Sequence, residues 1–355
     1  MSRFLADHLQ TLAPYVPGEQ PQDQQYVKLN TNESPFPPSP LVVEALNRQI
    51  ISRLNLYPDP LAKALCEAIA EEYGLAPQNV FAGNGSDEVL AFAFMAYGDG
   101  RGFAFPEISY GFYRVYARLY GQLQTAVPLN KDFTVPAEKF CNLHRPIAIA
   151  NPNAPTSVAM KRSDIESILR TNADNVVLID EAYIDFGGET CLPLLKRYPN
   201  LLIVRTCSKS RSLAGGRLGY ALASEEIIGD LNRLKNSFNP YSINSLTLLA
   251  GIEAMRDKAY FRRCVAAIVA QREQSAGDLR ALGFTVLNSA SNFLFAAPPR
   301  ITGEAYYRGL KQKGVLVRYF SDPLLRDYVR ISVGSAAQMQ TLLDKTQELL
   351  KEAAL

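Results

Sequence analysis

The chain has 355 residues, of which 47% are hydrophobic and 20% charged, and its 37 Lys and Arg residues nearly balance its 35 Asp and Glu residues. These values predict two ordinary domains or one large one, and they exclude a disordered chain and a basic polyanion-binding protein. The longest apolar run, Val89 to Tyr97, is too short to cross a membrane, and no cysteine or histidine spacing indicates a disulfide framework or a metal site. We therefore expect a cytoplasmic protein with reduced, mostly buried thiols, no secretory signal, no metal and no nucleic-acid partner.

The first 30 residues are predicted to form an irregular arm. Leu9 and Leu12 suggest a short helical turn, which three prolines then interrupt. Four further prolines in 34–40 favour extended backbone, and Ser39 followed by Pro40 predicts the start of a helix that continues to about Leu54.

From residue 31 to residue 244, short apolar segments alternate with helical ones. A capping box over 163–166 predicts the start of one helix. The other expected helices cover 61–73, 86–97 and 111–120, and the expected strands cover 80–82, 102–105, 147–150, 176–179, 201–204 and 217–223. Because the strands are continuously apolar, we predict a large α/β domain with a mostly parallel sheet flanked by helices on both faces.

A different pattern begins near residue 245. It consists of a long helix at 259–282, strands at 284–287 and 292–295, a helix at 302–313, strands at 315–318 and 328–333, and a final amphipathic helix that contains Met339 and Leu350. This pattern predicts a smaller α+β domain over residues 245–355, joined by part of the N-terminal segment.

Candidate functional residues follow three of the predicted strands, at the edge where open α/β sheets bind their ligands. The turn from Gly83 to Asp87 opens a helix, and its free backbone N–H groups suit a phosphate, although a plain glycine turn is the alternative. Asp180 follows the strand at 176–179. This carboxylate could face a protonated ring nitrogen, with the Tyr183 hydroxyl beside it, or it could cap a helix or pair with an arginine.

The third strand end carries a lysine. Lys209 lies between Ser208 and Ser210, and Arg217 comes eight positions later in the chain. A lysine in such a loop is usually a solvated surface charge, but a desolvated lysine has a lowered pKa and can form a Schiff base. The hydroxyls and Arg217 suit a phosphate. Pyridoxal 5′-phosphate satisfies all three strand ends, because it offers a phosphate to the turn and Arg217, an aldehyde to Lys209 and a pyridine nitrogen to Asp180.

On these motifs the chain resembles the fold type I pyridoxal-phosphate-dependent aminotransferases, and within them the histidinol-phosphate aminotransferase family. The resemblance runs nearly end to end and is carried by the segments 12–18, 29–35, 57–60, 83–88, 151–156, 180–183, 208–219 and 329–334. It implies a large cofactor-binding α/β domain, a small α+β domain and an obligate homodimer with shared active sites. The implied reaction is transamination between histidinol phosphate and 2-oxoglutarate by a ping-pong mechanism.

The resemblance also implies roles for individual residues. Lys209 would hold the cofactor as a Schiff base and shuttle a proton, Asp180 would keep the pyridine nitrogen protonated, and Tyr183 would hydrogen-bond the 3-oxygen of the ring. The remaining cofactor contacts would come from Tyr57 of the neighbouring subunit, from Tyr110 stacked on the ring, and from Gly85, Ser86, Asp87, Thr206, Ser208 and Arg217 around the phosphate. Tyr15, Arg318 and Arg330 would bind the acidic group of the substrates. Ordinary packing is the alternative for Tyr110 and Tyr57, and a solvated charge is the alternative for Arg318.

The chain departs from the family pattern at two places. The family has an asparagine that hydrogen-bonds the 3-oxygen of the cofactor, whereas this chain has Ala154 at that position. Either Tyr183 would bind that oxygen alone, or Asn153 would be re-aimed. The segment from Pro106 to Tyr110 is also longer than the family's usual spacing, which bears on the alignment of Tyr110.

Other functions remain open at this point. An aromatic amino-acid aminotransferase would use the same kind of arginine and an apolar slot for a ring. A pyridoxal-phosphate-dependent threonine-phosphate decarboxylase shares the motif set and a phosphorylated substrate. A non-catalytic binding module on the same fold is disfavoured by the presence of Lys209.

Overall fold

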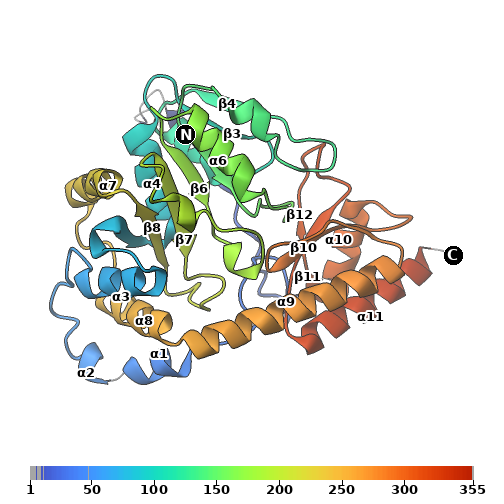
Figure 1. Ribbon diagram of the computed structural model, residues 1–355. Helices are drawn as coiled ribbons and strands as arrows, with labels where there is room; N and C mark the ends of the chain where they lie inside the picture. The colour runs from blue at the N-terminus through green and yellow to red at the C-terminus, as the bar shows by residue number, and fades with distance from the viewer. Residues whose placement is uncertain (1–4, 6–8, 11, 47, 354–355) are drawn as a thin grey trace.

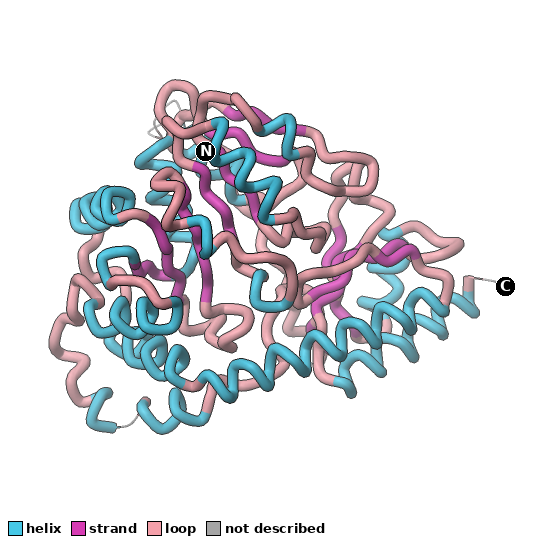
Figure 2. The backbone as a smooth tube through the Cα atoms, viewed as in Figure 1, coloured by secondary structure: helices cyan, strands magenta, loops and turns pink. Residues whose placement is uncertain are grey.

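The computed structural model describes residues 5, 9–10, 12–46 and 48–353, and it contains two groups of strands joined by a long helix (Figure 1, Figure 2). Within these residues the larger group is a seven-stranded sheet in the order β2-β8-β7-β6-β5-β3-β4. The smaller group is a four-stranded sheet in the order β12-β13-β10-β9. The α/β prediction for the large domain and the α+β pattern after it are thus confirmed.

The large sheet is mixed. Strand β8 runs antiparallel to its neighbours β2 and β7, and the other strands pair in parallel. The strands predicted between 80 and 223 are all present, and β4 is an addition at the edge. Only one residue of β4 is fully buried, so this strand lacks the apolar run that indicated the others. The bounds are β2 (Val80–Asn84), β3 (Phe103–Pro106), β4 (Gln124–Val127), β5 (Ile147–Ala150), β6 (Val177–Asp180), β7 (Leu201–Thr206) and β8 (Leu218–Ala223).

Helices cover both faces of this sheet. In β5, Ile147 and Ile149 pack into a core with residues of α3, α6 and α8, whereas Ala148 packs into a core with residues of α4, α5 and α7. Alternate strand residues therefore face opposite layers, and each buried isoleucine or leucine contributes roughly 1.5–3 kcal/mol relative to an exposed one. The α-helices are α3 (Lys63–Tyr73), α4 (Gly85–Tyr97), α5 (Phe112–Leu119), α6 (Arg162–Thr171), α7 (Glu225–Phe238) and α8 (Ser245–Arg256), and single 3₁₀ turns are η2 (Pro77–Asn79), η3 (Ala137–Phe140), η4 (Ile184–Phe186) and η5 (Leu192–Leu194).

The helix predicted from Ser39 starts as expected but is shorter. Ser39 Oγ accepts a hydrogen bond from the Val42 N–H at 3.4 Å, and Pro40 is the first helical residue. Helix α1 (Pro40–Ala45) then ends, and α2 (Arg48–Ile51) follows as a separate short helix. Val42 is the only buried residue of α1, so a longer helix would have gained little packing energy.

The capping box predicted at 163–166 is wrong. Helix α6 begins at Arg162 after Lys161, so Ser163 is already inside the helix and cannot be its N-cap. The first helical N–H, that of Arg162, instead donates to Glu189 at 2.9 Å. A carboxylate from a distant loop therefore takes the role that the sequence assigned to a local hydroxyl.

The small sheet is antiparallel, and it carries its helices on one side. Its strands are β9 (Thr285–Val286), β10 (Phe293–Ala297), β12 (Arg318–Tyr319) and β13 (Val329–Ser332), and its helices are α9 (Lys258–Ala281), α10 (Gly303–Gln312) and α11 (Ala336–Glu352). The N-terminal segment joins this unit, because β1 (Val27–Lys28) pairs in parallel with β11 (Val315–Leu316). Leu29, directly after β1, is buried in the same core as Ile331 of β13.

The border between the two units lies near α9, which runs from α8 to the small sheet (Figure 1). Ala250, Ala254 and Met255 of α8 are buried in one core with Leu65 of α3. The sequence-based division at residues 244 and 245 stays a prediction, and on this packing we propose the start of α9 as the border.

Two sequence expectations concern the surface and the thiols. All five cysteines are free, and four of them are buried, as expected. Of the helices in the described part of the chain, none combines the length and the apolarity that crossing a bilayer requires.

Candidate active site

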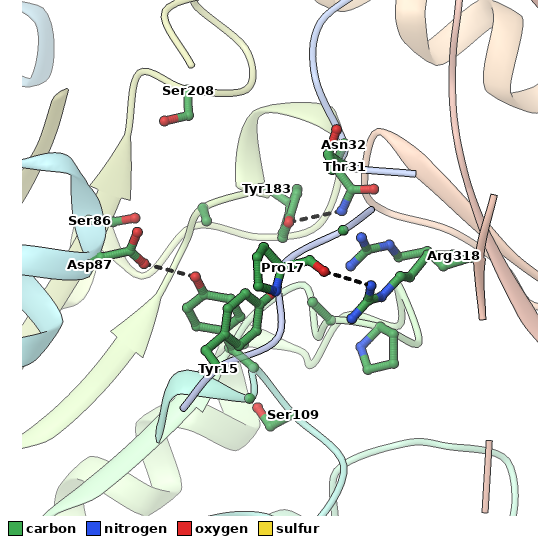
Figure 3. Close-up of a pocket in the computed structure, with 18 of the residues that line it drawn as sticks. Tyr15, Pro17, Thr31, Asn32, Ser86, Asp87, Ser109, Tyr183, Ser208 and Arg318 are labelled. Atoms are coloured by element: carbon green, nitrogen blue, oxygen red, sulfur yellow. Dashed lines mark hydrogen bonds between the residues drawn. The ribbon is translucent and has the colours of Figure 1, made fainter. Parts of the chain in front are cut away.

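A cavity of about 640 Å³ opens at the carboxyl ends of the central strands, between the large sheet, the small sheet and the N-terminal arm. The structure brings most of the predicted site residues to its wall: Tyr15, Ser86, Asp87, Tyr110, Asp180, Tyr183, Thr206, Ser208, Lys209, Arg217, Arg318 and Arg330. Ser86, Asp87 and Ser208 lie on one side of this cavity and Arg318 lies on the other, with Tyr183 between them (Figure 3). We call these sides the cofactor end and the substrate end.

The turn between β2 and α4 is tightly packed at the cofactor end. Gly85 has a φ of +80°, and a Cβ there would lie 2.7 Å from Nη2 of Arg217. A Cβ on Gly219 of β8 would lie 2.1 Å from the backbone nitrogen of Ser86. Only glycine fits at both positions, and the first N–H groups of α4 are thereby held against the cavity wall, where an anion can bind.

Arg217 and two hydroxyls complete this anion-binding corner. Arg217 Nη2 forms an ion pair with Asp87 at 2.9 Å, and the Tyr110 hydroxyl donates to the other oxygen of Asp87 at 2.8 Å. Asp87 thus orients a guanidinium and an aromatic ring together. The Thr206 hydroxyl donates to Ser208 Oγ at 2.9 Å beside them.

Asp180 and Glu181 are adjacent buried carboxylates with different partners. The Glu181 carboxylate forms an ion pair with Arg205 at 2.7 Å, and neither residue lines the cavity. Asp180 faces the cavity, and its donors among the described residues are neutral: the Tyr113 hydroxyl at 3.0 Å and the Ala182 N–H at 3.1 Å. Burial raises the pKa of Asp180 to about 6, although both hydrogen bonds act in the opposite direction. The arginine partner that sequence reasoning offered as the alternative for Asp180 therefore belongs to Glu181.

Lys209 is a partly buried amine that no described carboxylate contacts. Its Nζ donates to the Thr31 carbonyl oxygen at 3.3 Å and lies 5.9 Å from the ring centroid of Tyr183. Burial, and secondly the charge of Arg330, lower the pKa of Lys209 to about 8. A substantial fraction of this amine is therefore neutral and nucleophilic near physiological pH.

Tyr183 and Asp180 each have a partner that sequence reasoning missed. Asn32 donates its Nδ2 to the Tyr183 hydroxyl at 3.1 Å (Figure 3). Tyr113 donates to Asp180 and is completely buried. Asn32 lies in the segment 29–35 that carries the family resemblance, which was the one available signal. No feature of the sequence distinguishes Tyr113 from an ordinary aromatic residue of the core.

Asn153 is not re-aimed toward the cavity. Its Nδ2 donates to the Ile108 carbonyl oxygen and to Thr156 Oγ1, both at 3.0 Å, and the residue does not line the cavity. Ala154 does line it. Of the two alternatives for the 3-oxygen, the geometry leaves Tyr183.

The substrate end carries two arginines without an ion pair among the described residues. Arg330, on β13, packs between the rings of Phe293 and Phe320, and its Nη2 donates to the Asn30 carbonyl oxygen at 3.0 Å. Its Nε is buried and has no hydrogen-bond partner within the described residues. Arg318, on β12, donates to the carbonyl oxygens of Val16 and Pro17 in the N-terminal arm, at 2.9 and 3.0 Å.

Two tyrosines occupy contrasting places. The ring of Tyr15 in the arm stacks on Phe112 at a centroid distance of 4.3 Å and borders the cavity. Tyr57 lies outside the cavity, is 82% exposed and stacks on Tyr241 at 4.6 Å. Its contribution to the site of a neighbouring subunit stays a prediction.

No group of three or more His, Cys, Asp or Glu residues in the described part of the chain could hold a metal ion.

Comparisons with known proteins identify the family. The family model described as aminotransferase class I and II matches residues 24–345. The histidinol-phosphate aminotransferase of Marinomonas sp. is 49% identical over 346 residues, which cover 96% of this chain and 98% of that protein. The enzyme of the same name from Clostridium acetobutylicum is 46% identical over 351 residues, covering 99% and 100%. The chain belongs to the histidinol-phosphate aminotransferase family.

The fold agrees with this assignment. The crystal structure of histidinol-phosphate aminotransferase from Sinorhizobium meliloti in complex with pyridoxal-5′-phosphate matches with a TM-score of 0.87 at 23% identity, covering 98% of this chain and 99% of that chain. The chain is therefore an aminotransferase with the fold of the pyridoxal-phosphate-dependent enzymes. Such enzymes transfer an amino group between an amino donor and a keto acid.

Pyridoxal 5′-phosphate is the cofactor of this family, and the residues present fit it. The packed turn at Gly85 and Gly219, with Ser86, Ser208 and Arg217, suits a phosphate. Asp180 is a buried carboxylate without a cation, as a site for a protonated pyridine nitrogen requires. Lys209 is a partly buried amine with a lowered pKa, as a lysine that condenses with an aldehyde requires.

Proposed function

We propose that this chain transfers the amino group of histidinol phosphate to 2-oxoglutarate by a ping-pong mechanism, with Lys209 as the covalent attachment point of the cofactor. Near-full-length identity of 43–49% to proteins named histidinol-phosphate aminotransferase carries this proposal. Arg318 and Arg330 at the substrate end form no ion pair among the described residues and support the proposal, because both substrates bring an anionic group to the same cavity.

At the cofactor end, each residue has one task. When bound, pyridoxal phosphate supplies an aldehyde for the amine and a cationic ring that withdraws electrons. Lys209 would form the covalent bond with that aldehyde and, once displaced by substrate, would accept and return the proton at the substrate carbon, since its pKa of about 8 suits both directions near neutral pH. Asp180 would hold the proton on the ring nitrogen. Tyr183 would donate to the 3-oxygen, and Tyr110 would stack on the ring.

The anion-binding corner keeps the cofactor in place while Lys209 is free. Gly85, Ser86 and Asp87 present the first turn of α4, and Thr206, Ser208 and Arg217 supply two hydroxyls and a guanidinium. Arg217 is pre-oriented by Asp87, so little side-chain entropy is lost on phosphate binding.

At the substrate end, Arg330 binds the phosphate of the donor and, in the other half-reaction, the distal carboxylate of 2-oxoglutarate. Desolvation lowers the pKa of Arg330, yet arginine stays protonated in proteins. This partly buried guanidinium, which forms no ion pair among the described residues, can therefore bind an anion. Arg318 and Tyr15 add contacts from β12 and the arm.

The working unit that we propose is a homodimer with shared sites. Tyr57 and Tyr241 form an exposed stacked pair, and Leu54, Leu56 and Leu61 nearby are also at least half exposed. A second copy of the chain would cover this apolar surface, and Tyr57 would then contact the cofactor phosphate bound in that second copy.

A donor screen tests the proposal. With 2-oxoglutarate as acceptor, we expect kcat/KM for histidinol phosphate to exceed that for phenylalanine by at least tenfold. A preference for phenylalanine would make the chain an aromatic amino-acid aminotransferase. Release of carbon dioxide from threonine phosphate without a keto-acid product would make it a decarboxylase.

A further inference from the structure

Asn32 connects the small sheet to Tyr183 through every polar group that it has. Its N–H donates to Ser332 Oγ at 2.8 Å, and its carbonyl oxygen accepts from Asn292 at 3.1 Å. Its Oδ1 accepts from the Ser332 hydroxyl at 3.0 Å, and its Nδ2 donates to the Tyr183 hydroxyl at 3.1 Å. Asn32 is 1% exposed, and its φ is +56°, a conformation that asparagine tolerates better than most residues.

The structure orients the Asn32 amide with its oxygen toward Ser332 and its nitrogen toward Tyr183. The Ser332 oxygen accepts from the Asn32 N–H while the Ser332 hydroxyl donates to Oδ1, so the serine uses its proton and one lone pair on Asn32. In this arrangement the amide nitrogen donates to the Tyr183 hydroxyl. The donated hydrogen bond occupies a lone pair of the Tyr183 oxygen and leaves the proton of that hydroxyl for another acceptor.

No described residue accepts the Tyr183 proton, and the side chain borders the cavity. Because Ala154 carries no donor and Asn153 is bonded elsewhere, Tyr183 is the donor left for the 3-oxygen of the cofactor. The direction of a single O–H bond therefore decides how well that oxygen is stabilised as an anion.

We propose that Asn32 is a positioning residue that aims the Tyr183 proton at the 3-oxygen of the cofactor, and so sets the pH at which the lysine–cofactor linkage loses its proton. This inference rests on the proposed function, because it requires the cofactor to be bound at Lys209. It assigns to the N-terminal segment the control that the family pattern gives to an asparagine at position 154.

The test is a spectrophotometric pH titration of the cofactor-loaded protein, which reads the protonation of that linkage from its visible absorbance without turnover. Asn32→Gly removes the amide and tolerates the positive φ, so the backbone is kept. We expect the midpoint to rise by about 0.5–1 pH unit, the shift produced by weakening one hydrogen bond to the charged oxygen. Asn32→Asp, nearly the same shape but unable to donate, is expected to shift the midpoint in the same direction.

A double-mutant cycle separates positioning from a merely structural role. Tyr183→Phe alone should raise the midpoint, and adding Asn32→Gly to it should cause no further rise. Asn292→Ala is the matched control, since it removes a buried bond to the backbone of Asn32 and leaves the amide in place, and its midpoint should equal that of the wild type.

Three results overturn the inference alone: an unchanged midpoint in both Asn32 variants, a downward shift, or an Asn32→Gly effect that persists in the Tyr183→Phe background. A downward shift would mean that the amide takes the Tyr183 proton instead of directing it. If the wild type itself shows no visible absorbance with pyridoxal phosphate, the proposed function fails and this inference fails with it.

Discussion

The two ends of the cavity are built in different ways. At the cofactor end, Asp180 is the last residue of β6, and Ser208 and Lys209 lie in the loop after β7. Asp180 and Ser208 hydrogen-bond residues of the large domain, and Lys209 donates to the Thr31 carbonyl oxygen. At the substrate end, Arg318 and Arg330 lie on strands of the small sheet and donate to backbone carbonyls of the N-terminal segment, without an ion pair among the described residues.

This difference matches what each end binds. A cofactor that stays bound is held best by groups that are fixed before it binds, and buried strands fix such groups. Two substrates that differ in size and in anionic group must share the other end. Arg318 and Arg330 form no ion pair among the described residues, so either anion can bind them without displacing a carboxylate. We therefore expect substitutions at the cofactor end to abolish the chemistry and those at the substrate end to weaken binding and selectivity.

The largest effect is expected for Lys209→Ala. Because the amine is both the attachment point and the proton carrier, kcat should fall by about 10⁴-fold or more. The purified wild type should show visible absorbance with pyridoxal phosphate, and the variant should not develop the same band. Lys209→Arg, which keeps a charge but not the reactive amine, should be equally inactive. An unchanged rate in either variant contradicts the assignment of the cofactor end.

Asp180→Asn is expected to lower kcat by about 10³-fold, because an amide does not stabilise a cationic ring nitrogen. The same substitution should not lower the thermal stability of the cofactor-free protein at pH 8. The pKa of Asp180 is raised to about 6 in the folded state, so its contribution to stability is present at low pH and is lost as the pH rises toward 6. At pH 8 the cofactor-free variant should therefore have a Tm equal to or above that of the wild type. A clearly lower Tm would show that Asp180 is structural.

Arg330→Met is expected to lower kcat/KM by about 10²-fold for histidinol phosphate and for 2-oxoglutarate alike, the loss typical of removing one partner of a buried charge pair. Arg318→Met is the matched comparison at the same end. It should cost less, because Arg318 already donates to two carbonyl oxygens of the arm. If Arg330→Met affects neither substrate, Arg330 does not belong to the site.

The smallest expected effect concerns the rate of cofactor uptake. Since burial lowers the pKa of Lys209 to about 8, the neutral amine is depleted tenfold for each pH unit below that value. Stopped-flow absorbance with the cofactor-free protein should show uptake slowing accordingly from pH 8 to pH 6 and levelling off above pH 8. Arg330→Met removes a charge that lowers this pKa, so the whole profile should move to higher pH.

The cofactor end was the more predictable part of the molecule. Asp180 ends the apolar strand β6, and Lys209 comes three residues after the end of β7. The parallel pairing of these two strands brings both residues to one edge of the sheet, so short-range sequence patterns were sufficient. The directions of the central strands and the long helix α9 followed from the same patterns.

The remaining contacts depend on residues far apart in the chain. Asn32 and Tyr183 are separated by 151 positions, and Tyr113 and Asp180 by 67, and no spacing rule links such pairs. Glu189 displaced the predicted cap at Ser163 for the same reason, because a tertiary contact outweighed a local motif. The edge strand β4 was missed since one of its faces is open to solvent and its residues show no apolar run.

Gly219 has one more consequence. Because a Cβ there would stand 2.1 Å from the backbone of Ser86, strand β8 and the first turn of α4 are packed backbone against backbone. A ligand bound on that turn is therefore held against a strand of the large sheet, and its binding free energy should raise the melting temperature of the large domain. Gly219→Ala adds one methyl group at a residue that does not line the cavity, yet it should displace this turn and weaken cofactor binding.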